Sequence, residues 1–187
     1  SSGLPQDKID EIIGFVPNAV YEIVDDNEES IYNGASGINA LIGCPRHLFR
    51  GDLLTIADKS LRWIHLGGAG CEHFMIPELI NSDIQFTNGK IIQGPEVADH
   101  ALALLLSLTR NIALVLRGEK SNLPRPIELR GKTMLIIGMG GIGQLIAERA
   151  AAFGMDVIGI NPDYIPMLSF CKKVYTPERL TEKLPLA

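Results

Sequence analysis

The chain has 187 residues, of which 46% are hydrophobic, and this composition excludes a disordered polypeptide and suits one or two packed cores. Its 17 basic and 22 acidic side chains give a net charge of -5, without a dense block of Lys and Arg, so we expect no nucleic-acid partner. The most apolar stretch, residues 101–116, is interrupted by Arg110 and Asn111 and is too short to span a membrane. It predicts a buried helix and no membrane partner.

The three cysteines favour a reducing compartment. Cys44, Cys71 and Cys171 are an odd number, are widely spaced and lack the C-x-x-C spacing that metal sites and redox pairs use. Residues 1–3 (SSG) begin neither a signal peptide nor an obvious transit peptide. We therefore expect a cytoplasmic protein with no metal site.

The first ninety residues are typical of a small α/β unit, in which strands and helices alternate. Short apolar runs separated by Asp, Asn, Gly and Ser lie at residues 9–16, 20–24 and 38–42. The run 61–66 (LRWIHL) contains aromatic and β-branched residues and predicts a strand, which ends at the glycine-rich loop 67–70. Residues 84–87 predict another short strand.

A long helix is expected next. Pro95 suits the first turn of a helix, where a missing N–H does no harm, and the positive helix end favours the carboxylates of Glu96 and Asp99. We expect this helix to run to about Arg117 and to end at Gly118.

Residues 121–130 are expected to link two domains. Pro124 and Pro126 lack N–H donors and restrict the residues before them, which disfavours a helix or a strand here. The sequence thus predicts two domains, residues 1–95 and 96–187.

The pattern after residue 130 is that of a β-α-β unit. A strand at 133–137 leads into GMGGIG, an alanine-rich helix follows to about Phe153, and a second strand is expected at 157–160. A further helix is expected at 177–183. A G-x-G-x-x-G motif alone is weak, but these neighbours make it specific for a dinucleotide-binding loop.

Each glycine of this loop has a physical reason. Gly138 permits the tight turn, Gly140 lets the backbone approach a diphosphate without a Cβ in between, and Gly143 lets helix and strand pack closely. The N–H groups around Gly141 and Ile142 then point at the phosphates from the positive end of the helix. The alternative is an ordinary close-packed turn with no ligand.

The sequence leaves the choice between NAD and NADP open. NAD-binding units usually carry an acidic residue about 20 residues after the glycines, at the end of the second strand, where it holds the ribose hydroxyls. This chain has Asn161 there, which can bond a ribose but does not repel a 2′-phosphate. No Arg follows at once to bind that phosphate, so NAD is slightly favoured.

Several motifs then occur in one order. They are LRWIHLGGAGCEHF, INSDIQFTNGK, GPEVADHALALLLSLTRN and LRGKTMLIIGMGGIGQLIAERAAAFGMDVIGINP. With them the chain resembles the D-2-hydroxyacid dehydrogenases, closely over residues 61–162 and in outline over residues 1–60. The resemblance implies an α/β fold with a flavodoxin-like substrate domain, residues 1–95, and an incomplete Rossmann dinucleotide-binding domain within residues 96–187.

The resemblance also implies a substrate site and a partner. The backbone N–H groups of Gly68, Ala69 and Gly70 would hold the substrate carboxylate, since small residues expose the backbone and successive amides bind anions. A tight turn without function is the alternative. Members of the family pair through the cofactor domain, which implies a homodimer of the full-length protein.

No residue of this chain is assigned to catalysis. The family uses a histidine oriented by a carboxylate and an arginine that grips the substrate, and the resemblance implies that all three lie beyond Ala187. His65, His73 and His100 do not occupy the catalytic position, and Trp63 is expected in the core. About two strands of the cofactor domain would leave apolar surface exposed, so we expect either a fragment of a longer subunit or a truncated product completed by a partner.

Three functions stay open for the parent protein. The resemblance implies an oxidoreductase that transfers a hydride between NAD(P)H and a small 2-keto or 2-hydroxy acid, such as glyoxylate, hydroxypyruvate or pyruvate. A non-catalytic NAD(H)-sensing binding or regulatory module of the same fold is the alternative. A third is another two-domain nicotinamide protein, such as a hydrolase with tightly held NAD. The 187-residue chain alone is expected to be inactive.

Overall fold

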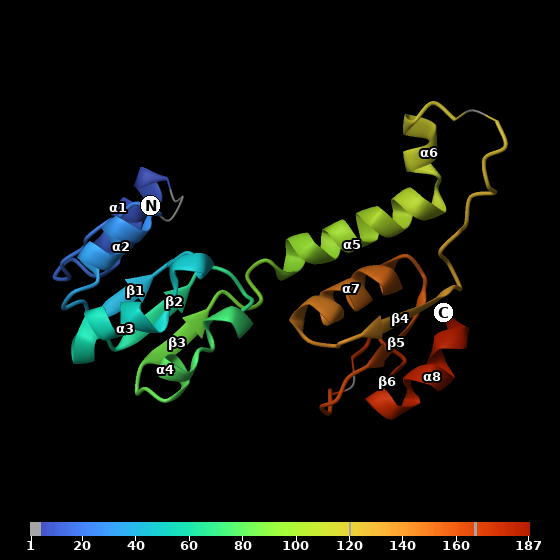
Figure 1. Ribbon diagram of the computed structural model, residues 1–187. Coiled ribbons are helices and arrows are strands. Elements are labelled where there is room, and N and C mark those ends of the chain that lie inside the picture. The colour runs from blue at the N-terminus through green and yellow to red at the C-terminus, as the bar shows by residue number, and fades with distance from the viewer. Residues whose placement is uncertain (1–4, 120, 167) are drawn as a thin grey trace. The chain divides into compact units, whose positions relative to one another are not determined.

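The computed structural model describes residues 5–119, 121–166 and 168–187, so the expectation for residues 1–3 lies outside the described part. The chain divides into two compact units, Ser1–Lys90 and Ile91–Ala187 (Figure 1). Each unit contains a three-stranded parallel sheet and helices, which confirms the α/β class. The division falls at Lys90, shortly before the boundary that the sequence suggests after residue 95.

In the first unit, parallel strands alternate with helices. Its helices and strands are α1 (Gln6–Phe15), α2 (Glu28–Gly34), β1 (Ala40–Ile42), α3 (Gly51–Ala57), β2 (Trp63–Leu66), α4 (Pro77–Ile80) and β3 (Gln85–Asn88). The strands lie in the order β1-β2-β3, and Ile64 of β2 lies between Leu41 and Phe86. The strands expected at 61–66 and 84–87 are confirmed, whereas the apolar run 20–24 forms neither helix nor strand.

One face of this sheet carries the core of the first unit. Ile64 and Leu53 are 2% and 0% exposed, and they belong to one cluster with side chains from α2, α3 and α4. Because side chains alternate along a strand, Trp63 lies on the opposite face, where it is 38% exposed. The expectation that Trp63 lies in the core is therefore wrong.

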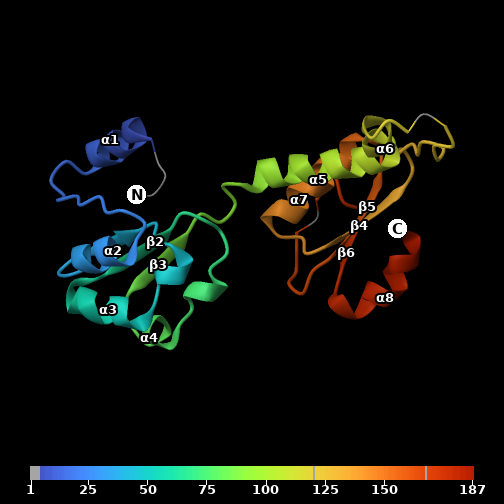
Figure 2. The ribbon, with the colours of Figure 1, turned by 45° about the horizontal axis from the view of Figure 1, so that its top comes forward.

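The second unit contains the expected β-α-β arrangement. Its helices and strands are α5 (Gly94–Thr109), α6 (Ile112–Leu116), β4 (Thr133–Ile137), α7 (Gly141–Ala152), β5 (Asp156–Ile160), β6 (Lys173–Tyr175) and α8 (Leu180–Lys183). The strands lie in the order β4-β5-β6, and α5 and α7 lie side by side (Figure 2). The sheet has three strands where about two were expected, because β6 is only three residues long and starts at a lysine, which hides it in the sequence.

The long helix expected up to Arg117 is interrupted. Asn111 adopts a left-handed conformation with φ 59°, and its side-chain amide donates to the carbonyl of Pro124 at 2.5 Å. The chain therefore turns after Thr109, and α6 leaves the axis of α5 (Figure 1). Within residues 101–116, the expectation of a buried helix holds at Leu102 and Asn111, while the other side chains are half-buried or exposed. Over the described ranges, no helix is long and apolar enough to cross a bilayer.

The segment 121–130, expected to link two domains, lies within the second compact unit. Its backbone is held there: the N–H of Ile127 donates to the carbonyl of Thr109 at 2.8 Å. The N–H of Gly131 then donates to the carbonyl of Gly154 at 2.8 Å, just before β4 begins. The prolines prevent regular structure in this segment.

Helices α5 and α7 are joined by close packing and by charge. A Cβ added at Gly94 would lie 2.9 Å from Cδ1 of Leu145, so the glycine permits the close approach. Further along, Nε of Arg149 donates to the Asp99 carboxylate at 2.6 Å, and the Arg149 side chain is only 27% exposed. This pairing fixes α7, whose first residues belong to the glycine loop, against α5.

Candidate functional site

The glycine loop begins where β4 ends. Gly138 has φ 95°, a conformation that residues with a side chain rarely adopt, and its N–H donates to the carbonyl of Ile160 at 2.8 Å. The turn is therefore anchored to the end of the neighbouring strand β5. The predicted role of Gly138 in a tight turn agrees with this geometry.

Gly143 is required by packing. A Cβ added at this position would lie 2.0 Å from the carbonyl oxygen of Gly138 and 3.4 Å from the Ile136 side chain. No side chain fits at the first of these distances, so any larger residue would push the helix away from the strand. This agrees with the predicted role of Gly143.

Gly140 differs, because nothing in the chain requires a glycine there. Its φ is -71° and its ψ is -165°, which residues with side chains also adopt, and an added Cβ would meet no atom within 4 Å. The open space lies directly before the first turn of α7. A close-packed turn without a ligand explains Gly138 and Gly143 but leaves Gly140 unexplained.

The first turn of α7 presents free donors to this space. Among the described residues, no acceptor faces the backbone N–H groups of Gly141, Ile142 and Gly143. These groups lie at the positive end of a 12-residue helix, the usual place for a phosphate. The loop residues thus fit a dinucleotide diphosphate in both shape and polarity.

Asn161 lies beside the same loop, and its amide is bound to the chain at both ends. Its Oδ1 accepts the N–H of Met139 at 3.0 Å, and its Nδ2 donates to the carbonyl of Asp163 at 3.1 Å. The sequence suggests Asn161 as a ribose ligand but gives no sign of the contact with Met139, since the two residues are far apart in sequence.

The second glycine loop, 67–70, follows β2 in the first unit. Two of its carbonyl groups are held by the last residue of β3 and the residue after it. The N–H of Gly89 donates to the carbonyl of Gly68 at 2.9 Å, and Nδ2 of Asn88 donates to the carbonyl of Ala69 at 2.6 Å. Within the described part of the chain, the N–H groups of Gly68, Ala69 and Gly70 have no acceptor. An exposed loop with fixed carbonyls and free amides suits an anion.

The histidines show no catalytic arrangement. Nδ1 of His65 lies 2.9 Å from Oγ1 of Thr87, which also accepts the Trp63 indole N–H at 2.8 Å, while His73 and His100 are exposed. Among the described residues, no ion pair joins a histidine to a carboxylate. No catalytic histidine is therefore assigned in this chain.

Two of the three cysteine thiols are buried. The three cysteines are free, and burial raises the pKa of the Cys44 thiol to about 11 and also raises that of Cys171. Such thiols are protonated at neutral pH and are poor nucleophiles. The described residues contain no group of three His, Cys, Asp or Glu side chains placed to hold a metal ion.

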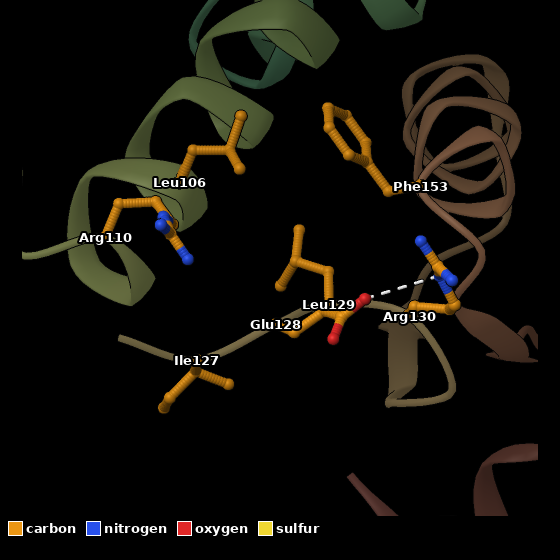
Figure 3. A pocket seen from close by; sticks show the side chains of 7 residues that line it. All are labelled: Leu106, Arg110, Ile127, Glu128, Leu129, Arg130 and Phe153. Carbon is orange, nitrogen blue, oxygen red and sulfur yellow. Dashed lines mark ion pairs between the residues drawn. The ribbon is translucent and has the colours of Figure 1, made fainter. Parts of the chain in front are cut away.

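One hollow of the surface lies in the second unit. It measures about 230 Å³ and is lined by Leu106, Arg110, Ile127, Glu128, Leu129, Arg130 and Phe153 (Figure 3). Phe153 follows the last residue of α7, whereas the glycine loop precedes the first, and 12 helical residues span about 18 Å. The hollow is therefore not the glycine-loop site.

A parallel β-α-β unit with these three glycines at the start of its helix defines a Rossmann-type dinucleotide-binding protein. Residues 101–185 match the family model of the D-isomer specific 2-hydroxyacid dehydrogenase NAD binding domain. The chain is therefore similar to the D-2-hydroxyacid dehydrogenases, over the residues 101–185 that match the family model and in the order of motifs noted in the sequence.

Two curated relatives show the same likeness. D-3-phosphoglycerate dehydrogenase of Methanocaldococcus jannaschii is 37% identical over 120 residues, which cover 62% of this chain and 22% of that protein. Hydroxypyruvate reductase of Thermotoga maritima is 36% identical over 112 residues, which cover 57% of this chain and 36% of that protein. The chain thus spans little more than a third, at most, of these relatives.

Solved structures extend the likeness over both units. A D-isomer specific 2-hydroxyacid dehydrogenase family protein from Aeromonas salmonicida gives a TM-score of 0.74 at 26% identity, covering 97% of this chain and 59% of that one. An acyclic imino acid reductase in complex with NADPH and D-Arg gives a TM-score of 0.69 at 25% identity, and the match covers 94% of this chain and 58% of that one. The similarity therefore includes the first unit, which lies entirely outside the family-model match.

Proposed function

We propose that the parent protein is an NAD-dependent oxidoreductase that interconverts a small 2-keto acid and the corresponding 2-hydroxy acid. The observation that carries this proposal is the open space at Gly140, which the fold itself does not need and which faces free N–H groups of α7. The bound dinucleotide supplies the hydride, and the loop residues of this chain bind and orient its diphosphate. The similarity to the D-2-hydroxyacid dehydrogenases and to a hydroxypyruvate reductase supports this substrate class.

The substrate carboxylate is proposed to bind at Gly68, Ala69 and Gly70. Their free N–H groups would donate hydrogen bonds to the substrate carboxylate. The keto group would then be left for the dinucleotide and the catalytic residues. The family's catalytic arginine, acidic residue and histidine are proposed to come from beyond Ala187. The isolated chain should therefore bind the cofactor without turnover of glyoxylate, hydroxypyruvate or pyruvate.

Gly140→Ala tests the cofactor site. The new methyl group meets no atom of the chain, so folding is retained, but it occupies the space where the diphosphate approaches. Titration of NADH fluorescence should show a loss of affinity of at least tenfold, with an unchanged melting temperature. Gly14→Ala, whose added Cβ also meets nothing within 4 Å but lies in α1, serves as the control and should bind NADH normally. Unchanged NADH affinity in Gly140→Ala contradicts the site.

We propose NAD as the preferred cofactor, with NADP as a weaker second. The family-model match concerns an NAD binding domain, whereas the imino acid reductase structure contains NADPH. Parallel titrations of the wild-type chain with NADH and NADPH measure the preference directly. An NADPH affinity well above that of NADH contradicts this order.

A non-catalytic NAD(H)-sensing module is the second candidate. It would need the glycine loop and its free N–H groups but no catalytic histidine. The full-length protein separates the two functions: turnover of a 2-keto acid with NADH supports the dehydrogenase, whereas tight NADH binding without turnover supports the sensor.

We also propose a homodimer in a reducing compartment such as the cytoplasm. Apolar side chains are exposed along the helices next to the dinucleotide unit, namely Leu104, Leu108, Ile112, Val115 and Leu116. Leu108→Glu should therefore shift the full-length protein from dimer to monomer in light scattering. Val20→Glu, at a 99% exposed position of the first unit, should leave the dimer intact. A Leu108→Glu protein that stays dimeric contradicts this surface.

A further inference from the structure

Asn161 has a role that its sequence position does not suggest. Its Oδ1 accepts from the N–H of Met139, and its Nδ2 donates to the carbonyl of Asp163. Exchanging the oxygen and nitrogen would place a donor against the Met139 N–H and an acceptor against a carbonyl, so only one orientation of the amide satisfies both contacts. The side chain is thus committed to the protein backbone on both sides.

Met139 is the residue on which this contact acts. It lies between Gly138 and Gly140, and its side chain is fully buried in the core of the second unit. Its carbonyl accepts from Nε2 of Gln144 at 3.0 Å, so both its backbone groups and its side chain are held. The contact with Asn161 is the one that joins the loop to the residue directly after β5.

We infer that Asn161 is a positioning residue: through the Met139 N–H it fixes the glycine loop, so that the amides of Gly141–Gly143 point at the diphosphate before it binds. This inference rests on the proposed function and adds to it. A loop that is already ordered loses less entropy when a ligand arrives, so the contact raises affinity without touching the ligand. A residue that only held the ribose would leave the unliganded loop unchanged.

Hydrogen exchange of the unliganded chain tests the contact. In Asn161→Leu, which has a similar size but no acceptor, the Met139 amide should exchange at least tenfold faster than in the wild type. Asn161→Asp keeps an acceptor and should remain within about threefold of the wild-type exchange rate. Asp163→Asn changes a neighbouring exposed side chain, keeps the backbone carbonyl and should leave the rate unchanged.

Binding of NADH to the same variants tests the consequence. Asn161→Leu should bind about tenfold more weakly than the wild type, and Asn161→Asp within about threefold of it. Two results would overturn the inference. One is a folded Asn161→Leu protein in which the Met139 amide exchanges at the wild-type rate. The other is an Asn161→Leu protein in which this amide exchanges faster but the affinity for NADH is unchanged. If Asn161→Leu does not fold, Asn161→Ala takes its place with the same expectations.

The two proposals fail in different ways. If the wild-type chain binds no dinucleotide, the proposed function fails, while the exchange of the Met139 amide still shows whether Asn161 orders the loop. If the wild type binds NADH and Asn161→Asp exchanges as fast as Asn161→Leu, the positioning role fails and the function stands.

Discussion

At the scale of single residues, the glycines of the second unit act for different reasons. Gly138 is needed for its positive φ, Gly143 for the approach of helix and strand, and Gly140 for neither. The motif predicted these three separate roles, and the atoms around Gly138 and Gly143 agree with the turn and packing roles. What the sequence could not show is that an added Cβ at Gly140 meets no atom of the chain, so that this position can be changed without a packing penalty.

Gly159 extends this argument to the core. A Cβ added there would lie 2.5 Å from Cγ of Met139, whose side chain is 0% exposed and has no space to move. Gly159→Ala should therefore lower the free energy of unfolding by about 1–3 kcal/mol through overpacking. Denaturant unfolding measures this change, with Gly140→Ala as a control of unchanged stability. Equal stability of the two variants contradicts the packing described for Met139.

At the scale of elements, the long and regular patterns were predictable and the short or interrupted ones were not. The residues of β4, α7 and β5 follow strand and helix patterns over at least five residues each, and the sequence predicted all three. The break at Asn111 was missed, because it depends on a bond to the distant Pro124 carbonyl. The contact of Asn161 with Met139 was missed for the same reason.

Trp63 was a different kind of error, because its burial depends on which faces of the sheet are covered. In the run WIHL, side chains of a strand alternate between two faces, so Trp63 and Ile64 lie on opposite faces of the sheet. Both could be buried only if the sheet were covered on both faces, as parallel sheets usually are. Ile64 is 2% exposed and Trp63 is 38% exposed, so the face that carries Trp63 is not fully covered.

The helix α8 carries a charge cluster whose effect depends on pH. Glu182 accepts from Arg179 and from Lys183, and these contacts lower its pKa from 4.5 to about 2. Because the pKa is lower in the folded state, the stabilisation is present above about pH 4.5 and is lost as the pH falls towards 2. Glu182 and Arg179 are about half exposed, so the effect is small.

Substitution of Glu182 by Gln isolates this contribution. The variant should melt at a slightly lower temperature than the wild type at pH 6. The difference should shrink at pH 3, because the carboxyl group of the unfolded wild type, with its pKa of 4.5, is protonated there and part of the stabilisation is lost. Circular dichroism melting curves at the two pH values provide the measurement. Glu148→Gln, at an exposed glutamate of α7 without an ion pair among the described residues, controls for a general charge effect. If the difference in melting temperature between the wild type and Glu182→Gln grows as the pH falls, the expected direction of the pH dependence is wrong.

At the scale of the whole molecule, each unit has a hydrophobic core of its own. Leu53 belongs to the cluster of the first unit and Val157 to that of the second, and both are almost completely buried. The two cores share no residue, so each unit should unfold as its own cooperative transition.

Truncations in the two cores test this independence. In scanning calorimetry, Leu53→Ala should lower the melting temperature of the first unit only, and Val157→Ala that of the second unit only. Each substitution should lower the free energy of unfolding of its unit by about 2–4 kcal/mol, because burial is lost and a cavity remains. Each variant is the control for the other. A single transition that both substitutions lower together would show that the two units unfold as one.

The burial of Met139 also affects how the protein withstands oxidants. Its thioether lies in the middle of the glycine loop sequence yet is shut off from solvent, whereas Met75 is 37% exposed. Peroxide attacks accessible thioethers first and turns them into polar sulfoxides, which a packed interior tolerates poorly. Mild oxidative damage should therefore reach Met75 while the sulfur beneath the glycine loop stays reduced.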